Sequence, residues 1–124
     1  MDLIDKHIIK RSTIAIKGLP LTSFFYKDIQ KCGLSAEEVF QMKGKYISTF
    51  IFKTRSPEEI ESHFLWLIKI GVLRREVDGQ GLTSKVRLTP LGRIILESDP
   101  NIPNKTNSLS ELFKNWIYRN ILLT

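Results

Sequence analysis

The stretch SPEEIESHFLWLIKIGVLRREVDGQGLTSKVRLTPLGRIILES, residues 56–98, decides the fold that this sequence predicts. Its first part predicts a helix, because Ser56 can cap the N-terminus, Pro57 suits the first helical position and Glu59 completes a capping box. Gly71 supplies the left-handed residue that ends this helix. Apolar residues recur inside it at helical spacing and are expected to face the core: Ile60, Phe64, Leu67 and Ile68.

The second part of the stretch predicts a β-hairpin and then another helix. Residues 72–77 predict one strand and residues 85–88 the returning strand, with Asp78-Gly79 as a tight-turn signal between them. Thr89 and Pro90 open the next helix by the same cap-plus-proline pattern. Very short connections join the three elements, so we expect the first helix to pack against the hairpin and its flanking helices.

This order of elements, with its Gly-Val-Leu-Arg-Arg junction and Leu-Thr-Pro-Leu-Gly-Arg exit, resembles the second half of a winged-helix domain, as found in winged-helix transcription regulators. More narrowly, LWLIKIGVLRREVDGQG and RLTPLGR resemble segments of a small uncharacterised winged-helix family associated with cyanobacteria, which implies no activity. The expected fold class is mainly α with a β-hairpin wing. It is a winged helix-turn-helix domain with additional N- and C-terminal helices.

The chain before this stretch predicts three further helices. Residues 3–16 have a moderate helical pattern, a second helix is stopped by Gly33, and a capping box at Ser35 opens a third. Cys32, among aromatic residues, is expected to be a small core residue. Residues 44–55 fit either a strand or a helical face, and they are too apolar for a solvated loop.

The sequence divides into a winged-helix domain with its N-terminal helices over residues 1–98, a linker over 99–107 and an amphipathic helix over 108–124. The linker is predicted from its Pro and Asn content. The final helix carries a continuous apolar stripe, which either packs on the domain or forms a homodimer. Its residues are Leu109, Leu112, Phe113, Trp116, Ile117 and Ile121.

Composition limits the class of protein. The 124 residues suit one domain, and 42% hydrophobic with 26% charged residues is typical of a globular protein. One cysteine excludes an intramolecular disulfide and favours a reducing compartment. The N-terminus lacks the apolar region of a signal peptide, and no apolar run approaches the roughly 20 residues that span a bilayer. We therefore expect a cytoplasmic protein with no membrane contact.

No motif indicates catalysis. The sequence contains no nucleophile elbow, no Walker-type loop and no paired-cysteine metal spacing. His7, His63 and Cys32 lack the close pairing of zinc ligands. The Asp78-Gly79-Gln80-Gly81 run lies between two strands and predicts a turn, not a phosphate-binding loop. We expect no enzyme activity, no metal and no cofactor.

DNA binding is the leading function, since 19 Lys and Arg against 13 Asp and Glu give a formal charge of +6. The winged-helix resemblance implies that residues 57–70 form the recognition helix and residues 72–88 the wing. Four cations on the wing would contact DNA phosphates: Arg74, Arg75, Lys85 and Arg87. Four more are candidates for additional phosphate contacts: Lys43, Lys45, Lys53 and Arg55.

The recognition helix itself fits DNA poorly. Its N-terminal end carries Glu58, Glu59 and Glu61, which phosphates would repel. Leu65 and Trp66 lie roughly 120–135° away from the main apolar direction. The alternative function is therefore a protein-interaction module without specific DNA binding, in which Glu58, Glu61, Leu65 and Trp66 face a partner. Leu112, Phe113 and Trp116 of the final helix complete this candidate interface, and burial of Leu65 and Trp66 within the chain stays open.

Overall fold

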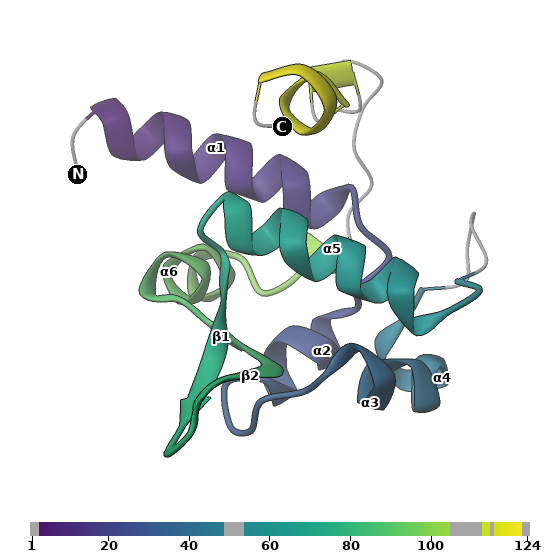
Figure 1. The fold of residues 1–124 in the computed structure, drawn as a ribbon. Coiled ribbons are helices and arrows are strands. Elements are labelled where there is room, and N and C mark those ends of the chain that lie inside the picture. Colours follow the sequence, from purple (N-terminus) through teal and green to yellow (C-terminus); the bar gives the residue numbers. More distant parts are fainter. Residues whose placement is uncertain (1–2, 49–53, 105–112, 115, 123–124) are drawn as a thin grey trace.

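A mainly helical chain with a two-stranded antiparallel hairpin is seen in the computed structural model, which describes residues 3–48, 54–104, 113–114 and 116–122 (Figure 1). The elements in chain order are α1 (Leu3–Lys17), α2 (Ser23–Asp28), α3 (Ala36–Gln41), α4 (Lys43–Tyr46), α5 (Pro57–Lys69), β1 (Leu73–Asp78), β2 (Gly81–Leu88), α6 (Pro90–Ser98), and two short helices, η1 (Ile102–Asn104) and η2 (Tyr118–Leu122).

The predicted capping box forms at α3, whereas at α5 only the Ser56 half forms, because the Glu59 carboxylate accepts from the Arg55 N–H at 3.1 Å. The Ser56 hydroxyl accepts a hydrogen bond from the Glu59 N–H at 3.4 Å, with Pro57 in the first turn of α5. Ser35 and Glu38 make a reciprocal capping box at α3, with both hydrogen bonds at 3.1 Å. These side chains satisfy N–H groups that a helix leaves without an internal partner. The predicted starts of α3 and α5 are confirmed.

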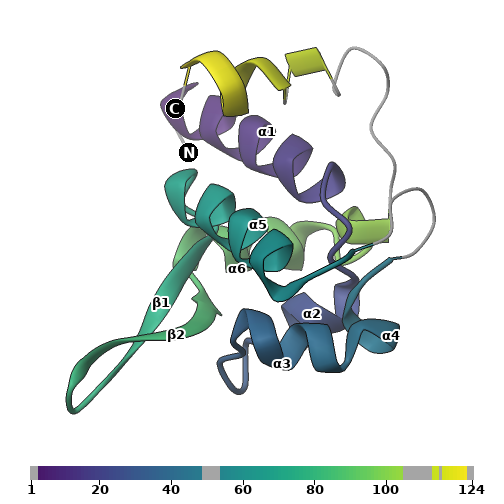
Figure 2. The ribbon, with the colours of Figure 1, turned by 45° about the vertical axis from the view of Figure 1, so that its right-hand side comes forward.

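The hairpin is longer than the sequence predicts. Leu73 pairs with Leu88 and Arg75 with Val86, and a bulge after Arg75 separates these pairs from the Val77–Leu82 pair. The returning strand therefore begins at Gly81, four residues before the predicted start at Lys85. Gly81 has φ +117°, which suits glycine at the tight turn. The hairpin extends away from the helices (Figure 2).

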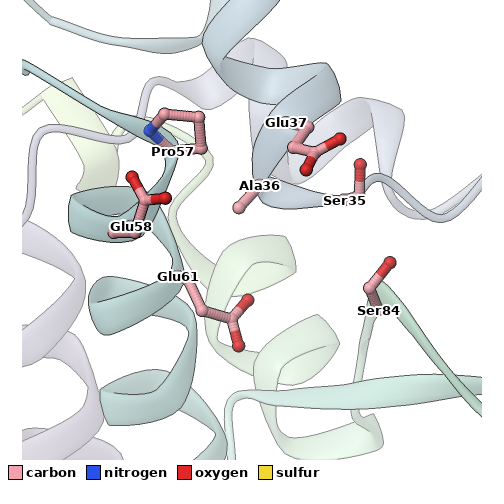
Figure 3. Close-up of a pocket in the computed structure, with 7 residues that line it drawn as sticks. All are labelled: Ser35, Ala36, Glu37, Pro57, Glu58, Glu61 and Ser84. Carbon is pink, nitrogen blue, oxygen red and sulfur yellow. The ribbon is translucent and has the colours of Figure 1, made fainter.

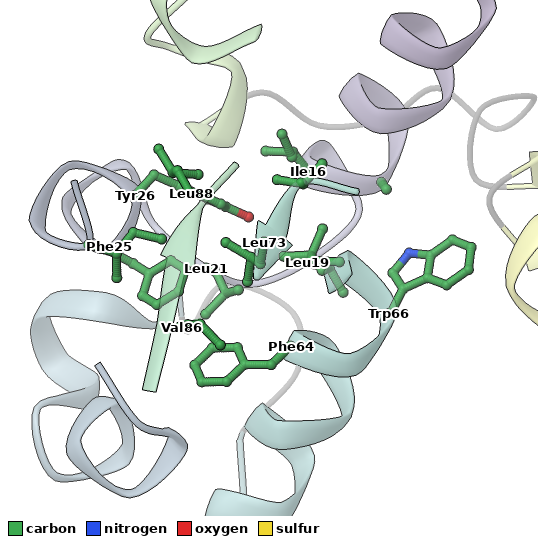
Figure 4. Close-up of a cluster of buried hydrophobic side chains, with 14 of the residues drawn as sticks. Ile16, Leu19, Leu21, Phe25, Tyr26, Phe64, Trp66, Leu73, Val86 and Leu88 are labelled. Carbon is green, nitrogen blue, oxygen red and sulfur yellow. The ribbon is translucent and has the colours of Figure 1, made fainter. Parts of the chain in front are cut away.

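The core gathers residues from α1, α2, α5, α6 and the base of the hairpin (Figure 4). The rings of Phe25 in α2 and Phe64 in α5 stack with their centroids 5.5 Å apart. Leu67, one turn beyond Phe64, is fully buried, as predicted. Val86 brings β2 into the same cluster and also forms an isolated bridge with Leu34. This packing fixes the hairpin against α5.

A close contact holds α6 against the start of the hairpin. Gly92 lies so near the chain that a Cβ atom there would be 2.5 Å from the Val72 carbonyl oxygen. The Thr89 hydroxyl caps α6 by accepting from the Gly92 N–H at 3.1 Å. Gly71, with φ +91°, ends α5 in the predicted left-handed conformation. The two connections of the hairpin, Gly71–Val72 and Thr89–Gly92, therefore pack against each other.

Some predictions on the rest of the chain change. Cys32 is exposed, because α2 ends at Asp28 and leaves Cys32 in a turn, so the prediction of a core cysteine is wrong. In the segment 44–55, α4 ends at Tyr46 and Ile47 bridges to Leu21. Residues 49–53 lie outside the described part. Ile102, in the predicted linker, is buried in the core.

The C-terminal part is described only at residues 113–114 and 116–122, which are helical. The start of the predicted final helix, with Leu109 and Leu112, lies outside the described residues. Residues 113–114 and 116–122 lie beside α1, on the side of the molecule away from the hairpin tip (Figures 1 and 2). Across the described helices, none has the length and hydrophobicity needed to traverse a bilayer.

Candidate functional site

The hairpin cations contact the body of the protein more than the sequence suggests. Arg75 on β1 forms an ion pair with Glu61 on α5, and its guanidinium also donates a hydrogen bond to the Ser84 carbonyl oxygen at 2.9 Å. The Arg75 side chain is largely buried. A cation held in this way links hairpin and helix, and its charge is already partly neutralised.

Arg87 on β2 has a similar structural role. Its guanidinium donates to the carbonyl oxygens of Ile29 at 2.8 Å and Gln30 at 3.0 Å, just after α2. It also pairs with Glu76 on β1 at 3.2 Å. The first two contacts tie β2 to the end of α2, where carbonyl groups lack helical partners, and the third joins the two strands.

Lys85 and Arg74 complete the set of four wing cations. Lys85 lies 3.7 Å from the Glu38 carboxylate of α3. The hydrogen bond from the Ser35 N–H is the largest cause that lowers the pKa of Glu38, and Lys85 adds to it. Arg74 is exposed, and its guanidinium donates to the Arg75 carbonyl oxygen at 3.3 Å. Three of these four cations therefore have a carboxylate partner within the chain.

The four additional candidates for phosphate contacts are not gathered with the wing. Lys45 on α4 pairs with Asp28 at 2.8 Å, and hydrogen bonds from Lys45 and then Tyr46 lower the pKa of Asp28. The Lys43 ammonium lies 4.8 Å from the centre of the Phe40 ring. Arg55 is exposed before α5, and Lys53 lies outside the described residues.

An open groove of about 270 Å³ lies between α3, α5 and the hairpin. Figure 3 shows that its lining residues come from these three elements: Ser35, Ala36, Glu37, Pro57, Glu58, Glu61 and Ser84. Neither Glu37 nor Glu58 pairs with a cation of the described chain. Glu61 shares its carboxylate with Arg75. The groove is therefore acidic, although the chain as a whole is basic.

The groove face of α5 continues along the helix. Glu58, Glu61 and Leu65 follow at helical spacing, and Leu65 is 55% exposed. Trp66, which the sequence also placed on a partner interface, is only 4% exposed and points away from the labelled core residues in Figure 4. The alternative that Trp66 is buried within its own chain is therefore confirmed.

Two further apolar surfaces are exposed. Val77 and Leu82 pair across the hairpin tip, and both are exposed. Phe113 and Trp116 in the C-terminal part are 62% and 54% exposed, with stacked rings whose centroids are 6.5 Å apart. Leu112, predicted with them, lies outside the described residues. Phe113 and Trp116 are therefore free of core packing, as an interface prediction requires.

Sequence reasoning missed five of the groove residues: Ser35, Ala36, Glu37, Pro57 and Ser84. Ser35 and Pro57 appear in the sequence only as helix-start signals, and no pattern around Ser84 indicates a binding site. The acidic run of residues 58–61 was the detectable part of the groove. In the described part of the chain, no group of three or more His, Cys, Asp or Glu side chains has the arrangement of a metal site.

A comparison with protein families gives one match, an Npun_F0494-like model that covers residues 3–119. The chain belongs to the Npun_F0494-like family. No curated protein and no solved structure matches it. The family description names no ligand, so the function has to be argued from the surfaces described above.

Proposed function

We propose that this member of the Npun_F0494-like family is a winged helix-turn-helix domain that acts as a protein-interaction module. In this proposal, the groove between α3, α5 and the hairpin binds a basic, partly apolar segment of a partner. The element order supports the fold: α3 packs against α5, the hairpin follows α5 directly, and the Leu34–Val86 bridge joins the start of α3 to β2.

The observation that carries the function is the acidic groove on the face where a winged-helix regulator would read DNA. Glu37 and Glu58 line it without cation partners, and Glu61 adds a third carboxylate. Phosphates brought to this surface would face like charges, which cost free energy when they are placed together across an interface. Lysine or arginine side chains of a protein segment would instead find complementary charge.

The apolar contribution comes from Leu65, which continues the same helix face beyond Glu61 and is exposed. A partner segment with apolar residues next to its cations could cover Leu65 while its cations reach Glu58. Such a segment would give the mixture of an apolar centre and a polar rim that is usual in protein interfaces. We therefore expect a basic amphipathic partner.

DNA binding is the second candidate, because Arg74, Lys43 and Arg55 are exposed and the chain carries a net charge of +6. In this candidate, the hairpin contacts phosphates through Arg74 and Lys85, and the groove stays empty. Such contacts attract DNA without reading its sequence, with dissociation constants of about 10⁻⁴ to 10⁻⁶ M at physiological salt.

Fluorescence anisotropy separates the two candidates. The probes are a basic amphipathic peptide, an acidic peptide with the same apolar positions, and a duplex of mixed sequence. The interaction module should bind the basic peptide, and Glu58→Lys should weaken this binding on the order of tenfold or more. Glu97→Lys, which changes an exposed acid on α6, is the matched control and should leave binding unchanged.

The duplex gives the opposite expectation. Binding should be weak, and Glu58→Lys should strengthen it by removing a repulsion from the face beside the hairpin. Three results together would refute the interaction module and make DNA the partner. The duplex would bind tightly, Arg74→Ala and Lys85→Ala would weaken that binding, and neither peptide would bind. Each phosphate contact then adds about −0.9 to the slope of log K against log salt.

A further inference from the structure

The C-terminal part of the chain is attached to α5 by a polar contact. Arg119 in η2 donates a hydrogen bond from its Nη2 to the Ser62 hydroxyl at 3.0 Å. Ser62 lies in the middle of α5, and residues 113–114 and 116–122 lie beside α1 on the side away from the hairpin tip (Figure 2). Among the described residues, Arg119 has no carboxylate partner.

His63 is next to this contact and is poorly suited to carry a proton there. Its Nδ1 atom is buried and has no hydrogen-bond partner within the described chain. Burial, and after it the positive charge of Arg119, lower the pKa of His63 to about 4 against an opposing effect of Glu59. No other charged group, on α1 or elsewhere in the described chain, contributes to this shift.

Arg119 itself is partly withdrawn from water. Burial lowers the pKa of its guanidinium, although the side chain stays charged at neutral pH. A charged arginine thus lies beside a neutral histidine, in a place where the only acid that acts on the histidine, Glu59, belongs to the same helix. The described residues of the C-terminal part, 113–114 and 116–122, contain no carboxylate that could pair with a second positive charge.

We propose that His63 makes the attachment of residues 113–122 to α5 dependent on pH, so that a proton taken up from solvent by His63 repels Arg119 and releases this segment. In the attached state, His63 is neutral. In the released state, it is open to water and can bind the proton at the ordinary histidine pKa of about 6.5. The two states therefore differ in the number of protons that they bind.

The direction of the effect follows from this difference. Well above pH 6.5 neither state binds the proton, and the attachment has its full stability. Below pH 6.5 the released state gains a proton that the attached state does not, so the ratio of attached to released chains falls up to about tenfold per pH unit. The fall ends near pH 4, where His63 becomes protonated in the attached state also.

Release would free the part of α5 around Ser62 and His63. Successive residues of a helix are about 100° apart, which places His63 and Trp66 roughly a quarter turn or more from the stripe formed by Glu58, Glu61 and Leu65. The proposed device therefore acts on its own surface and does not rest on the proposed peptide groove.

Amide hydrogen exchange tests the proposal on the full chain. The protection factors of residues 118–122, corrected for the intrinsic exchange rate at each pH, should fall up to roughly 15-fold between pH 6.5 and pH 5.0. His63→Gln should abolish this fall, because glutamine does not titrate. His7→Gln removes the chain's other histidine, which is exposed on α1, and should behave as the unaltered protein.

A second measurement addresses the pairing itself. NMR titration of the His63 ring should give a pKa well below 6.5 in the unaltered protein, and Arg119→Gln should raise it. Protection that stays constant over this pH range, an equal fall in His63→Gln, or a His63 pKa that Arg119→Gln leaves unchanged would each overturn the proposal.

Discussion

Arg75 on β1 is paired with Glu61 on α5, so a cation expected to meet DNA is held by an acid expected to repel it. The same pattern recurs at Lys85, which lies near Glu38, and at Arg87, which pairs with Glu76. Each pair joins the hairpin to a helix or one strand to the other. These pairs leave Arg74 as the wing cation without a carboxylate partner among the described residues, while Glu37 and Glu58 keep the groove acidic.

Core packing predicts a clear contrast between two leucines of α5. Leu67→Ala should lower the free energy of unfolding by roughly 2–5 kcal/mol, because it removes a fully buried side chain and leaves a cavity. Leu65→Ala removes an exposed side chain and should change it by less than about 0.5 kcal/mol. Urea denaturation measures both, and equal midpoints for the two variants would show that α5 is rotated from the orientation described.

Arg87 was expected to contact DNA phosphates, but its hydrogen bonds within the chain predict a contribution to folding stability. Arg87→Ala removes the donors to the Ile29 and Gln30 carbonyl oxygens, and should lower stability by roughly 1–3 kcal/mol. Arg74→Ala, on the paired position of β1, should have little effect because Arg74 is exposed. Thermal unfolding followed by circular dichroism compares them, and an unchanged midpoint for Arg87→Ala would argue that these contacts contribute no net stability.

The contact between α6 and the hairpin predicts that Gly92 tolerates no side chain. A Cβ atom there would meet the Val72 carbonyl oxygen at 2.5 Å, and backbone cannot move aside cheaply. Gly92→Ala should therefore destabilise the protein by roughly 1–3 kcal/mol. Gly79→Ala is the control, since nothing lies within 4 Å of its added methyl group. Similar stability for the two variants would mean that α6 can move away from the strand.

The sequence predicted the helices and the hairpin because their signals are local. Ser35, Ser56 and Thr89 each act on an N–H group three residues away, and Leu67 follows from helical spacing alone. The pairing of Arg87 with carbonyl oxygens 57 and 58 residues earlier depends on how distant segments meet. Local patterns contain no such information, so the four wing cations looked equally free and Ser84 could not be linked to the groove.

The exposure of Cys32 and the burial of Trp66 could not be settled from local sequence patterns. Cys32 follows the end of α2, and a helix extended to Gly33 would have placed it differently. Trp66 lies roughly 120–135° from the main apolar direction of α5. Periodicity alone left its burial undecided, because burial there depends on which other parts of the chain cover this side of α5.

Acid should weaken the contact between α2 and α4. The pKa of Asp28 is lowered mainly by the hydrogen bond from Lys45, so the folded chain binds fewer protons at this site than the unfolded chain. Its stabilising contribution is complete above the ordinary pKa of 3.8 and is lost as pH falls through the lowered value. Between pH 6 and pH 3, Asp28→Asn should therefore lose less stability than the unaltered protein. Parallel urea midpoints over this range would contradict the prediction.

The exposed aromatic pair in the C-terminal part makes the predicted homodimer testable. Phe113 and Trp116 stack on each other yet remain largely open, and Ile121 is also exposed. Aromatic side chains bury about 150–250 Å² each when covered, and a standard interface buries about 1,200–2,000 Å² in total. Two copies of this surface, with neighbouring residues, are of the right order.

We expect light scattering at high micromolar concentration to give the mass of two chains, and the double variant Phe113→Ser, Trp116→Ser to give the mass of one. Phe24→Ser, which removes an exposed aromatic residue of α2, is the matched control and should remain dimeric. A monomer in the unaltered protein would refute the homodimer. A dimer that survives the double variant would place its interface elsewhere, and the exposed pair Val77 and Leu82 at the hairpin tip would be the next surface to change.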